Sequence, residues 1–464
     1  MNNGDIPGFS STSPAKSGMS PLPWPSPARA WYAVGVFALV LMLNFLDRGI
    51  VGLVVQPLKK DMGLSDTQVG LIMGFAFAVF YAIVGLPIAR LADSRSRRAI
   101  IGVGLATWSF MTALCGLAQN FWQLFLFRMG VGVGEACNGP ATFSMLADFF
   151  PKEKLARAAA VLNFGFTTGT GVSLLLGGAI LQMLSATPTV TLPVLGTLHS
   201  WQLTFMLVGV PGLLVALLLR TVVEPVRRGR MTGELGGRAG AVRNLPLGEV
   251  IRFMRRNGRT YGPMFLGLAL QTVLAFGVAG WTPTFFVRAY GWTVPHAAFA
   301  QGLIYLFIWP IGLIPGSMLA ERLAKKGHAD ANLRVTVIIQ ALFLPFAVLA
   351  PLMPTPGLCL TMLAIQGFIV AFSIGPQNAA LQVITPGEMR GQVTALFLFM
   401  FNIIGYGLGP SIVAAFTDHV FHDESKLGLS LASTVAILGP LAVLTLWSGL
   451  KAYGRSVIAA QAWH

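Results

Sequence analysis

A series of long apolar runs constrains the fold of this chain more than any other feature. Each run is close to the roughly 20 residues that an α-helix needs to cross about 30 Å of hydrocarbon. Apolar residues make up 55% of the 464 residues, and charged residues only 11%. Since backbone polar groups in lipid must be satisfied internally, the runs predict an all-α membrane protein. We count twelve runs, at residues 30–57, 67–90, 99–118, 122–148, 156–184, 201–223, 262–287, 298–322, 333–352, 358–383, 391–417 and 427–451.

The basic residues are distributed unevenly about these twelve runs. Of the 32 Lys and Arg, two lie inside runs, four (Lys59, Lys60, Arg288 and Lys426) lie on the side opposite the N-terminus, and all the others lie on the N-terminal side. This is the positive-inside bias, which predicts that both termini are cytoplasmic, at the inner membrane if the source is bacterial. The net charge of +15 therefore indicates topology and attraction to membrane lipids, and not a nucleic-acid partner.

Hydrophilic segments divide the chain into two halves. Residues 1–29 are rich in Ser, Pro and Gly and lack the features of a signal peptide, so we expect a disordered cytoplasmic tail. The stretch 224–261 predicts a cytoplasmic linker, and its segment 245–256 alternates apolar and basic residues as in a surface amphipathic helix. We expect six-helix bundles at 30–223 and 262–452, with a cytoplasmic tail at 453–464.

Four charged residues interrupt the apolar runs of the first half. Asp47 and Arg48 lie in the first run, and Arg128 and Glu135 lie two helical turns apart in the fourth. A charge at bilayer depth costs about 2.5–3.5 kcal/mol on insertion scales, so such residues mark a pathway or a protein-lined cavity. We expect the first helix to break or bend near residues 44–49, and Arg48 to reach the outer membrane surface as a helix-end residue.

The two halves share short sequence patterns. The loop after the second run carries an acidic residue followed four and five positions later by two basic residues, Asp93, Arg97 and Arg98, and the loop after the eighth run repeats this with Glu321, Lys325 and Lys326. Gly139-Pro140 likewise matches Gly375-Pro376. Internal repeats of this kind are typical of secondary transporters with a substrate site between the halves near the midplane.

In these features the chain resembles the major facilitator superfamily over about residues 30–455. The match rests on the two six-helix halves, the Asp93 loop with its copy at Glu321, and the arginine in the fourth helix. More narrowly, Asn44-Phe-Leu-Asp47-Arg48 with Arg128 and Glu135 resembles the bacterial form of the spinster family of lysolipid and sphingolipid transporters. The resemblance implies pseudo-symmetric bundles, alternating access, a proton as driving ion, and a polar cluster of the transport path at Asp47, Arg128 and Glu135.

The candidate site residues fall into three groups. We expect Asp47 to pair with Arg128, which would otherwise bind a substrate head group, and Glu135 to carry the coupling proton together with Asp47, because desolvation favours the neutral acid. An ion pair with a purely structural role is the alternative for Arg128. The remaining substrate-binding candidates are Asn44, Phe276, Tyr305, Phe372, Gln377 and Asn402. The cytoplasmic gating latch is expected to comprise Asp93, Arg97, Arg98, Arg157, Glu321, Lys325 and Arg390, with Asp93 near Arg390 and Glu321 near Arg157.

Three functions remain open from the sequence. The first is a proton-coupled carrier, acting as a monomer, of an amphiphilic or lipid substrate of lysolipid or sphingoid type. The second is a carrier of the same fold for drugs or small organic anions, and the third is a membrane enzyme or a passive lipid scramblase. Nothing in the apolar runs has the arrangement of a nucleophile with its base or of metal ligands, and the three cysteines lack metal-site spacing. We therefore expect no enzyme activity, no cofactor and no metal.

Overall fold

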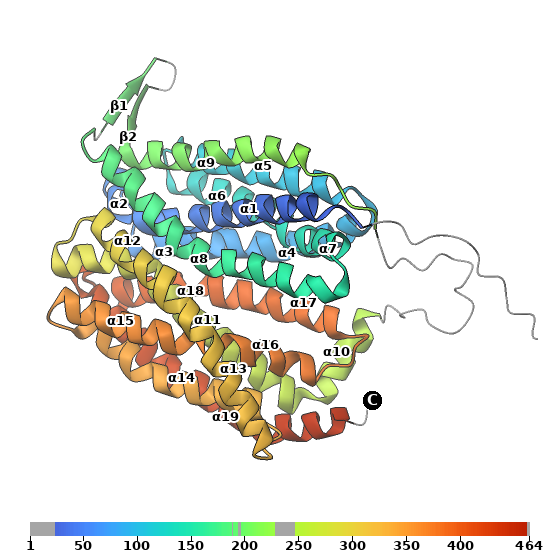
Figure 1. The fold of residues 1–464 in the computed structure, drawn as a ribbon. Helices are drawn as coiled ribbons and strands as arrows, with labels where there is room; N and C mark the ends of the chain where they lie inside the picture. The colour runs from blue at the N-terminus through green and yellow to red at the C-terminus, as the bar shows by residue number, and fades with distance from the viewer. Residues whose placement is uncertain (1–23, 188, 194–195, 228–245, 462–464) are drawn as a thin grey trace, which may run out of the picture.

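The computed structural model describes residues 24–187, 189–193, 196–227 and 246–461. Its helices form two bundles that lie side by side (Figure 1). The first bundle contains α1 (Pro27–Leu53), α2 (Val55–Met62), α3 (Asp66–Gly70), η1 (Leu71–Phe75), α4 (Ala76–Ser94), α5 (Arg97–Cys115), α6 (Phe121–Glu135), α7 (Asn138–Phe149), α8 (Lys152–Leu184), β1 (Thr189–Leu192), β2 (Gly196–His199), α9 (Ser200–Leu218) and η2 (Leu219–Thr221).

The second bundle repeats this organisation after the helix α10 (Leu247–Arg256). It contains α11 (Gly258–Tyr290), α12 (Val294–Leu303), η3 (Ile304–Ile308), α13 (Trp309–Lys325), α14 (Ala331–Leu349), η4 (Ala350–Leu352), α15 (Pro356–Ala371), α16 (Ile374–Val383), α17 (Arg390–Met400), η5 (Phe401–Gly407), α18 (Leu408–Ala415), η6 (Phe416–Phe421), η7 (Glu424–Lys426) and α19 (Leu427–Ala460). We call the end of the molecule that carries the antiparallel β1–β2 hairpin the hairpin end, and the opposite end, where α10 lies, the terminal end (Figure 1).

Six helical runs cross each bundle, as the hydropathy predicts. Ten helices of the described chain are long and apolar enough to span a membrane by length and composition. The other two crossings are α8, whose apolar part is the shorter Thr168–Leu184, and the pair α6–α7, which carries the buried charges. The amphipathic helix expected at residues 245–256 is confirmed as α10. Residues 1–23 of the expected N-terminal tail and residues 228–245 of the expected linker lie outside the described residues. The expected C-terminal tail at 453–464 is instead helical over most of its length, because α19 continues to Ala460.

Local sequence sets several of the helix boundaries. Ser65 and Gln68 form the capping box at the start of α3 that their spacing predicts. The prediction of a break near residues 44–49 is wrong, because α1 runs unbroken to Leu53. The polar side chains in that stretch find partners on α5 and α6, so the backbone of α1 does not have to open to satisfy them.

The breaks lie instead at equivalent places in the two bundles. The fourth crossing turns at Ala136 and Cys137 between α6 and α7, and the tenth turns at Phe372 and Ser373 between α15 and α16. In both, a proline occupies the third position of the new helix, where its missing N–H would have no intrahelical partner in any case. The repeat seen in the sequence therefore marks a pair of symmetric helix breaks.

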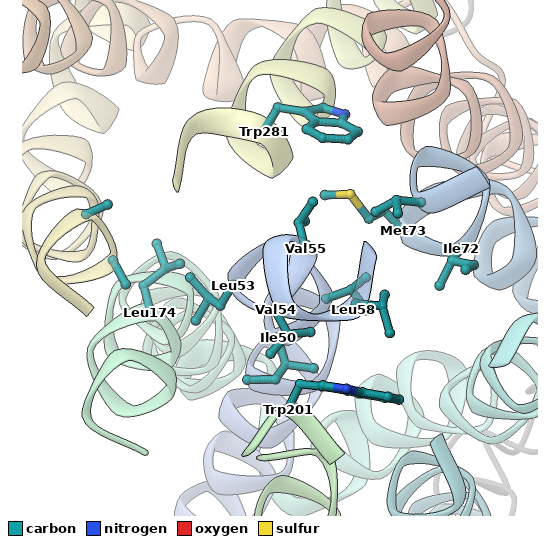
Figure 2. Close-up of a cluster of buried hydrophobic side chains, with 14 of the residues drawn as sticks. Ile50, Leu53, Val54, Val55, Leu58, Ile72, Met73, Leu174, Trp201 and Trp281 are labelled. Carbon is teal, nitrogen blue, oxygen red and sulfur yellow. The ribbon is translucent and has the colours of Figure 1, made fainter. Parts of the chain in front are cut away.

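The two bundles share an apolar core at the hairpin end. Val55 of α2 and Met73 of η1 point toward Trp281 of α11, while Ile50 of α1 lies beside Trp201 (Figure 2). The indole Nε1 of Trp281 donates to the carbonyl oxygen of Pro410 at 2.9 Å. The other clusters lie almost entirely within one bundle. Hydrophobic burial thus joins the bundles at one end.

Glycines let the bundles approach closely along two seams. A methyl group built on Gly74 would lie 2.6 Å from the carbonyl oxygens of Tyr406 and Gly407. On the other side of the molecule, a methyl group on Gly171 would lie 2.8 Å from the carbonyl oxygen of Gly302. Each seam runs beside a π-helix, η1 and η5 on one side and η3 on the other, a geometry often found at functional sites.

Candidate functional site

A buried ion pair between α1 and α6 is the centre of the candidate site. Arg128 Nη1 lies 3.5 Å from Asp47 Oδ1 and donates to the Asp47 carbonyl oxygen at 3.3 Å, and the Thr112 hydroxyl donates to Asp47 Oδ2. Both charged residues are buried, with exposures of 0% for Arg128 and 2% for Asp47. The two helices run in opposite directions, which brings both residues to within about two turns of the hairpin end. The structure thus contains the expected contact.

Arg48 forms a second, partly buried ion pair. Its Nε donates to Glu135 Oε2 at 2.8 Å, and Asn44, one turn earlier on α1, lies within hydrogen-bonding reach of the same carboxylate. The expectation that Arg48 reaches the outer surface is therefore wrong. Side chains in a helix tilt toward its N-terminus, and the N-terminus of α1 lies at the terminal end, so Arg48 extends inward. The tilt of helical side chains toward the helix N-terminus is therefore the signal that predicts an inward-pointing Arg48.

Aromatic rings from both bundles surround the Arg48 guanidinium. Its central carbon lies 4.5 Å from the ring centre of Phe77, 5.2 Å from Tyr81 and 5.5 Å from Tyr406, the last of which belongs to the second bundle. Tyr406 packs against Phe276 with ring centres 4.7 Å apart. Cation–π attraction of this kind strengthens when the groups are removed from water. The contact links the charges of the first bundle to the second.

Several polar atoms of this cluster have no hydrogen-bond partner among the described residues. They are Nε and Nη2 of Arg128, Oδ1 of Asp47 and Oε1 of Glu135, all inaccessible to solvent. A buried donor without an acceptor costs about 1–3 kcal/mol, and more if it is charged. The guanidinium of Arg128 is therefore under-satisfied in this state, and its Nε and Nη2 can donate to an incoming acceptor.

The second-bundle candidates divide into one that adjoins the charges and several that do not. Phe276 reaches the cluster through Tyr406, whose ring also packs against Phe77. Gln377 donates to Gln271 at 2.8 Å, and Gln271 donates to Ser373 at the α15–α16 break. The Asn402 side chain in η5 donates to the Leu398 carbonyl oxygen one turn earlier in the same membrane crossing. The remaining candidates pack on aromatic neighbours, Tyr305 on Trp309 and Phe372 on Phe368.

The latch candidates whose side chains are described form no ion pair across the bundles in this structure. Glu321 and Lys325 are exposed, Arg157 lies over the ring of Trp31 at 5.8 Å, and Arg390 donates to the Thr385 carbonyl oxygen of its own loop at 3.0 Å. The expected contact of Glu321 with Arg157 is thus not formed in this structure. The expected contact of Asp93 with Arg390 stays a prediction, because the Asp93 side chain lies outside the described part.

Arg97 and Arg98 bind within the first bundle. Arg97 is buried, pairs with Asp148 on α7 and donates from its backbone to Glu224 Oε1 at 2.8 Å, while Arg98 donates to the Arg220 and Val222 carbonyl oxygens. Partial burial alone would raise the pKa of Glu224, but hydrogen bonds from Ser96 and Arg97 outweigh it and hold that pKa below its ordinary value. Arg97 thus anchors the start of the linker through Glu224, and Arg98 holds the end of the preceding helix through backbone carbonyl oxygens.

An ion network at the hairpin end does join the bundles, and sequence reasoning did not find it. Arg288 of α11 holds Asp66 with both terminal nitrogens, at 2.6 and 2.8 Å, and Lys59 of α2 contacts Asp66 and, at 2.7 Å, Glu424. Asp66 is fully buried. All ion pairs between the bundles within the described residues lie in this network. Its members lie near the ends of four different helices, so no spacing in the sequence connects them.

Comparison with known proteins decides the family. A family model described as Major Facilitator Superfamily matches residues 37–410, which is more than half of the chain. The chain belongs to the major facilitator superfamily.

Individual relatives show how this superfamily member compares with others. It is 31% identical to an MFS-type efflux pump of Mycolicibacterium smegmatis, covering 93% of this chain and 95% of the relative, and 25% identical to a probable L-galactonate transporter of Escherichia coli, covering 87% and 86%. A crystal structure of a bacterial homolog of the human lysosomal transporter spinster, inward-facing and unoccupied, superposes with a TM-score of 0.76 at 26% identity, covering 94% of this chain and 99% of that one.

These comparisons confirm three of the expectations. The protein is a multi-pass integral membrane protein with the twelve-helix fold of major facilitator transporters, and its relatives are transporters rather than enzymes. The resemblance to the bacterial spinster form is confirmed by the similar structure. The relatives carry different cargo according to their descriptions, so substrate and driving ion have to be argued from the site.

Proposed function

We propose that this transporter moves an amphiphilic substrate with an anionic head group, of lysolipid or sphingoid type, by proton-coupled alternating access. The observation that carries the proposal is Arg128, which is fully buried beside Asp47 with two nitrogens, Nε and Nη2, that find no acceptor among the described residues. A phosphate or carboxylate head group would take up those donors in charge-assisted hydrogen bonds. The rings of Phe276, Phe401 and Tyr406 would line the path of the apolar tail.

The contacts at the two ends support alternating access. At the hairpin end the bundles are held by the Asp66 network, the shared apolar core and the glycine seams. At the terminal end Glu321 is exposed and Arg157 lies over the Trp31 ring, and no ion pair joins these two described latch residues. We infer a state closed at the hairpin end, with the termini in the cytoplasm and the cytoplasmic latch released. The latch would form when the bundles rock to the opposite state.

Glu135 and Asp47 are the proposed proton carriers. Each carboxylate forms an ion pair with an arginine, Glu135 with Arg48 and Asp47 with Arg128. Each also has one oxygen that accepts no hydrogen bond from a described residue. An arriving head group that engages Arg128 would remove a positive partner from the cluster and favour protonation of the acids. Because such coupling is reciprocal, pH must change substrate affinity by the same factor.

A second candidate is the transport of drugs or of small organic anions. The 31% identity to an efflux pump and the 25% identity to a probable sugar-acid transporter favour it. A small anion without an apolar tail would bind Arg128 and make no contact with the aromatic rings. An apolar drug would contact the rings and not Arg128. Substrate dependence of the Arg128 variants thus separates these cargoes.

The test is transport by the purified chain in proteoliposomes. A panel of lysophospholipids and sphingoid phosphates, a sugar acid and a cationic dye would be offered with and without an imposed pH gradient. We expect accumulation of an anionic amphiphile that depends on the gradient. Amphiphile flux that ignores the gradient would refute coupling, and accumulation of only the sugar acid or the dye would refute the substrate class.

Replacing Glu135 by Gln is expected to abolish accumulation driven by a pH gradient while sparing exchange of substrate across the membrane. The substitution fixes the neutral form of a side chain that lies buried against Arg48. The loss of accumulation should be about tenfold or more, comparable with removal of a proton-transfer group. The exposed Glu388 provides the matched control, since its Gln variant should behave as the wild type. Undiminished accumulation by Glu135→Gln would contradict the assignment.

The orientation predicts which introduced cysteines an external reagent can reach. A cysteine at the exposed Ser425, in η7 at the hairpin end, should react in intact cells. One at the exposed Lys154, at the terminal end, should react only after permeabilisation. Labelling at Lys154 but not Ser425 would place the termini outside.

A further inference from the structure

The helix α10 has one face fixed to the second bundle. Val250 is fully buried, and Phe253 packs edge-on against Tyr261 of α11 with ring centres 6.0 Å apart. The same cluster includes Met389 and Val393, at the start of α17. The position of α10 is therefore tied to α17, the helix that begins at the latch candidate Arg390.

The opposite face of α10 is exposed, basic and partly apolar. Arg252, Arg255 and Arg256 are exposed, and none forms an ion pair with a described residue. Leu247 and Ile251 are also exposed, at 48% and 37%. A short helix with exposed apolar side chains beside arginines that form no ion pair is typical of a helix that lies at the boundary between lipid head groups and acyl chains.

The place of α10 in the fold puts this face at the membrane boundary. The spanning helix α11 starts at Gly258, directly after α10, and its exposed Arg259 adds a fourth cation. Figure 1 shows α10 at the terminal end of the second bundle. A cluster of four or more basic residues next to a spanning helix attracts anionic lipid, and the planar guanidinium matches phosphate oxygens with two parallel hydrogen bonds.

We propose that the exposed face of α10, together with Arg259, binds the head groups of anionic phospholipids and that the bound lipid biases the position of α17. The occupant is the lipid of the surrounding leaflet and not the transported substrate. Since α10 packs on the first residues of α17, a lipid that draws α10 toward the membrane surface changes the balance between the two end states. This effect requires no particular cargo and is independent of proton coupling.

The first test is lipid binding by the full chain. Binding of phosphatidylglycerol to the detergent-solubilised protein would be followed by native mass spectrometry for the wild type and for Arg252→Gln/Arg255→Gln. We expect the double variant to bind anionic lipid about tenfold more weakly, because charges near an anionic surface dominate such affinity. The control is Lys451→Gln/Arg455→Gln, which removes two exposed cations from α19 at the same end. Equal loss in both variants, or in neither, would overturn the assignment to α10.

The second test asks whether the lipid moves the bundles. Spin labels at Lys154→Cys and His328→Cys, both exposed at the terminal end of different bundles, report the separation there. In nanodiscs, replacing phosphatidylcholine with phosphatidylglycerol should shift the distance distribution in the wild type and in the α19 control but not in Arg252→Gln/Arg255→Gln. An equal shift in all three proteins, or no shift in the wild type, would refute the link to α17. A failure of the proposed cargo or proton coupling would leave both readouts unchanged.

Discussion

Replacing Arg128 by alanine is expected to abolish transport of an anionic amphiphile and to destabilise the protein by about 3–5 kcal/mol, as for removal of one partner of a buried ion pair. The cause is Asp47, which would remain buried with Thr112 as its main polar partner. The measurements are the thermal midpoint of the detergent-solubilised protein and uptake into proteoliposomes. Arg128→Lys should keep much of the stability, because it keeps the charge, but it should bind substrate more weakly because it lacks the planar fork.

The double variant Asp47→Asn/Arg128→Ala separates a structural role from a functional one. Removing both charges leaves no unpaired buried ion, so a large part of the lost stability should return. If Arg128 only holds α1 to α6, transport should return with it. We expect the double variant to fold and still fail to transport. Recovery of transport in that protein would contradict substrate binding by Arg128.

Replacing Gly74 by leucine is expected to prevent closure at the hairpin end and to reduce transport to a few per cent of the wild-type rate or less. Even a methyl group at this position would lie 2.6 Å from two carbonyl oxygens of the facing π-helix η5, and backbone atoms cannot rotate away. The variant should accumulate in the state open at the hairpin end. Cysteine accessibility at buried positions of the shared core, such as Val55, would report this state.

Gly85 provides the control for this experiment. It lies on α4, in the same membrane crossing as Gly74, and a methyl group built on it meets no other atom within 4 Å. Gly85→Leu should therefore transport normally and show no added reactivity at Val55. Normal transport by Gly74→Leu would show that the seam does not have to close in every cycle.

The sequence predicts those parts of this structure that depend on local pattern. Hydropathy predicts the crossings, the Ser65–Gln68 spacing predicts a helix start, and counting residues from opposite ends of α1 and α6 brings Asp47 to the depth of Arg128. It does not predict features that depend on side-chain direction or on packing of distant segments. Arg48 is adjacent to Asp47 in sequence but points inward to Glu135, and Asp66 meets Arg288 only because the bundles dock. The π-helices also lack a sequence signal of their own.

The β1–β2 hairpin is a surface at which a binding protein can inhibit the transporter without entering the substrate path. His199, the last residue of β2, lies 3.1 Å from Asp61 of α2, and Trp201 donates to the same carboxylate at 3.1 Å. Two residues earlier on α2, Lys59 belongs to the network that closes this end. An antibody fragment bound to the hairpin would thus restrain α2, and under the proposed topology it would inhibit transport from the outer side of the membrane. Because it does not compete with cargo, its inhibition would not be relieved by raising the substrate concentration.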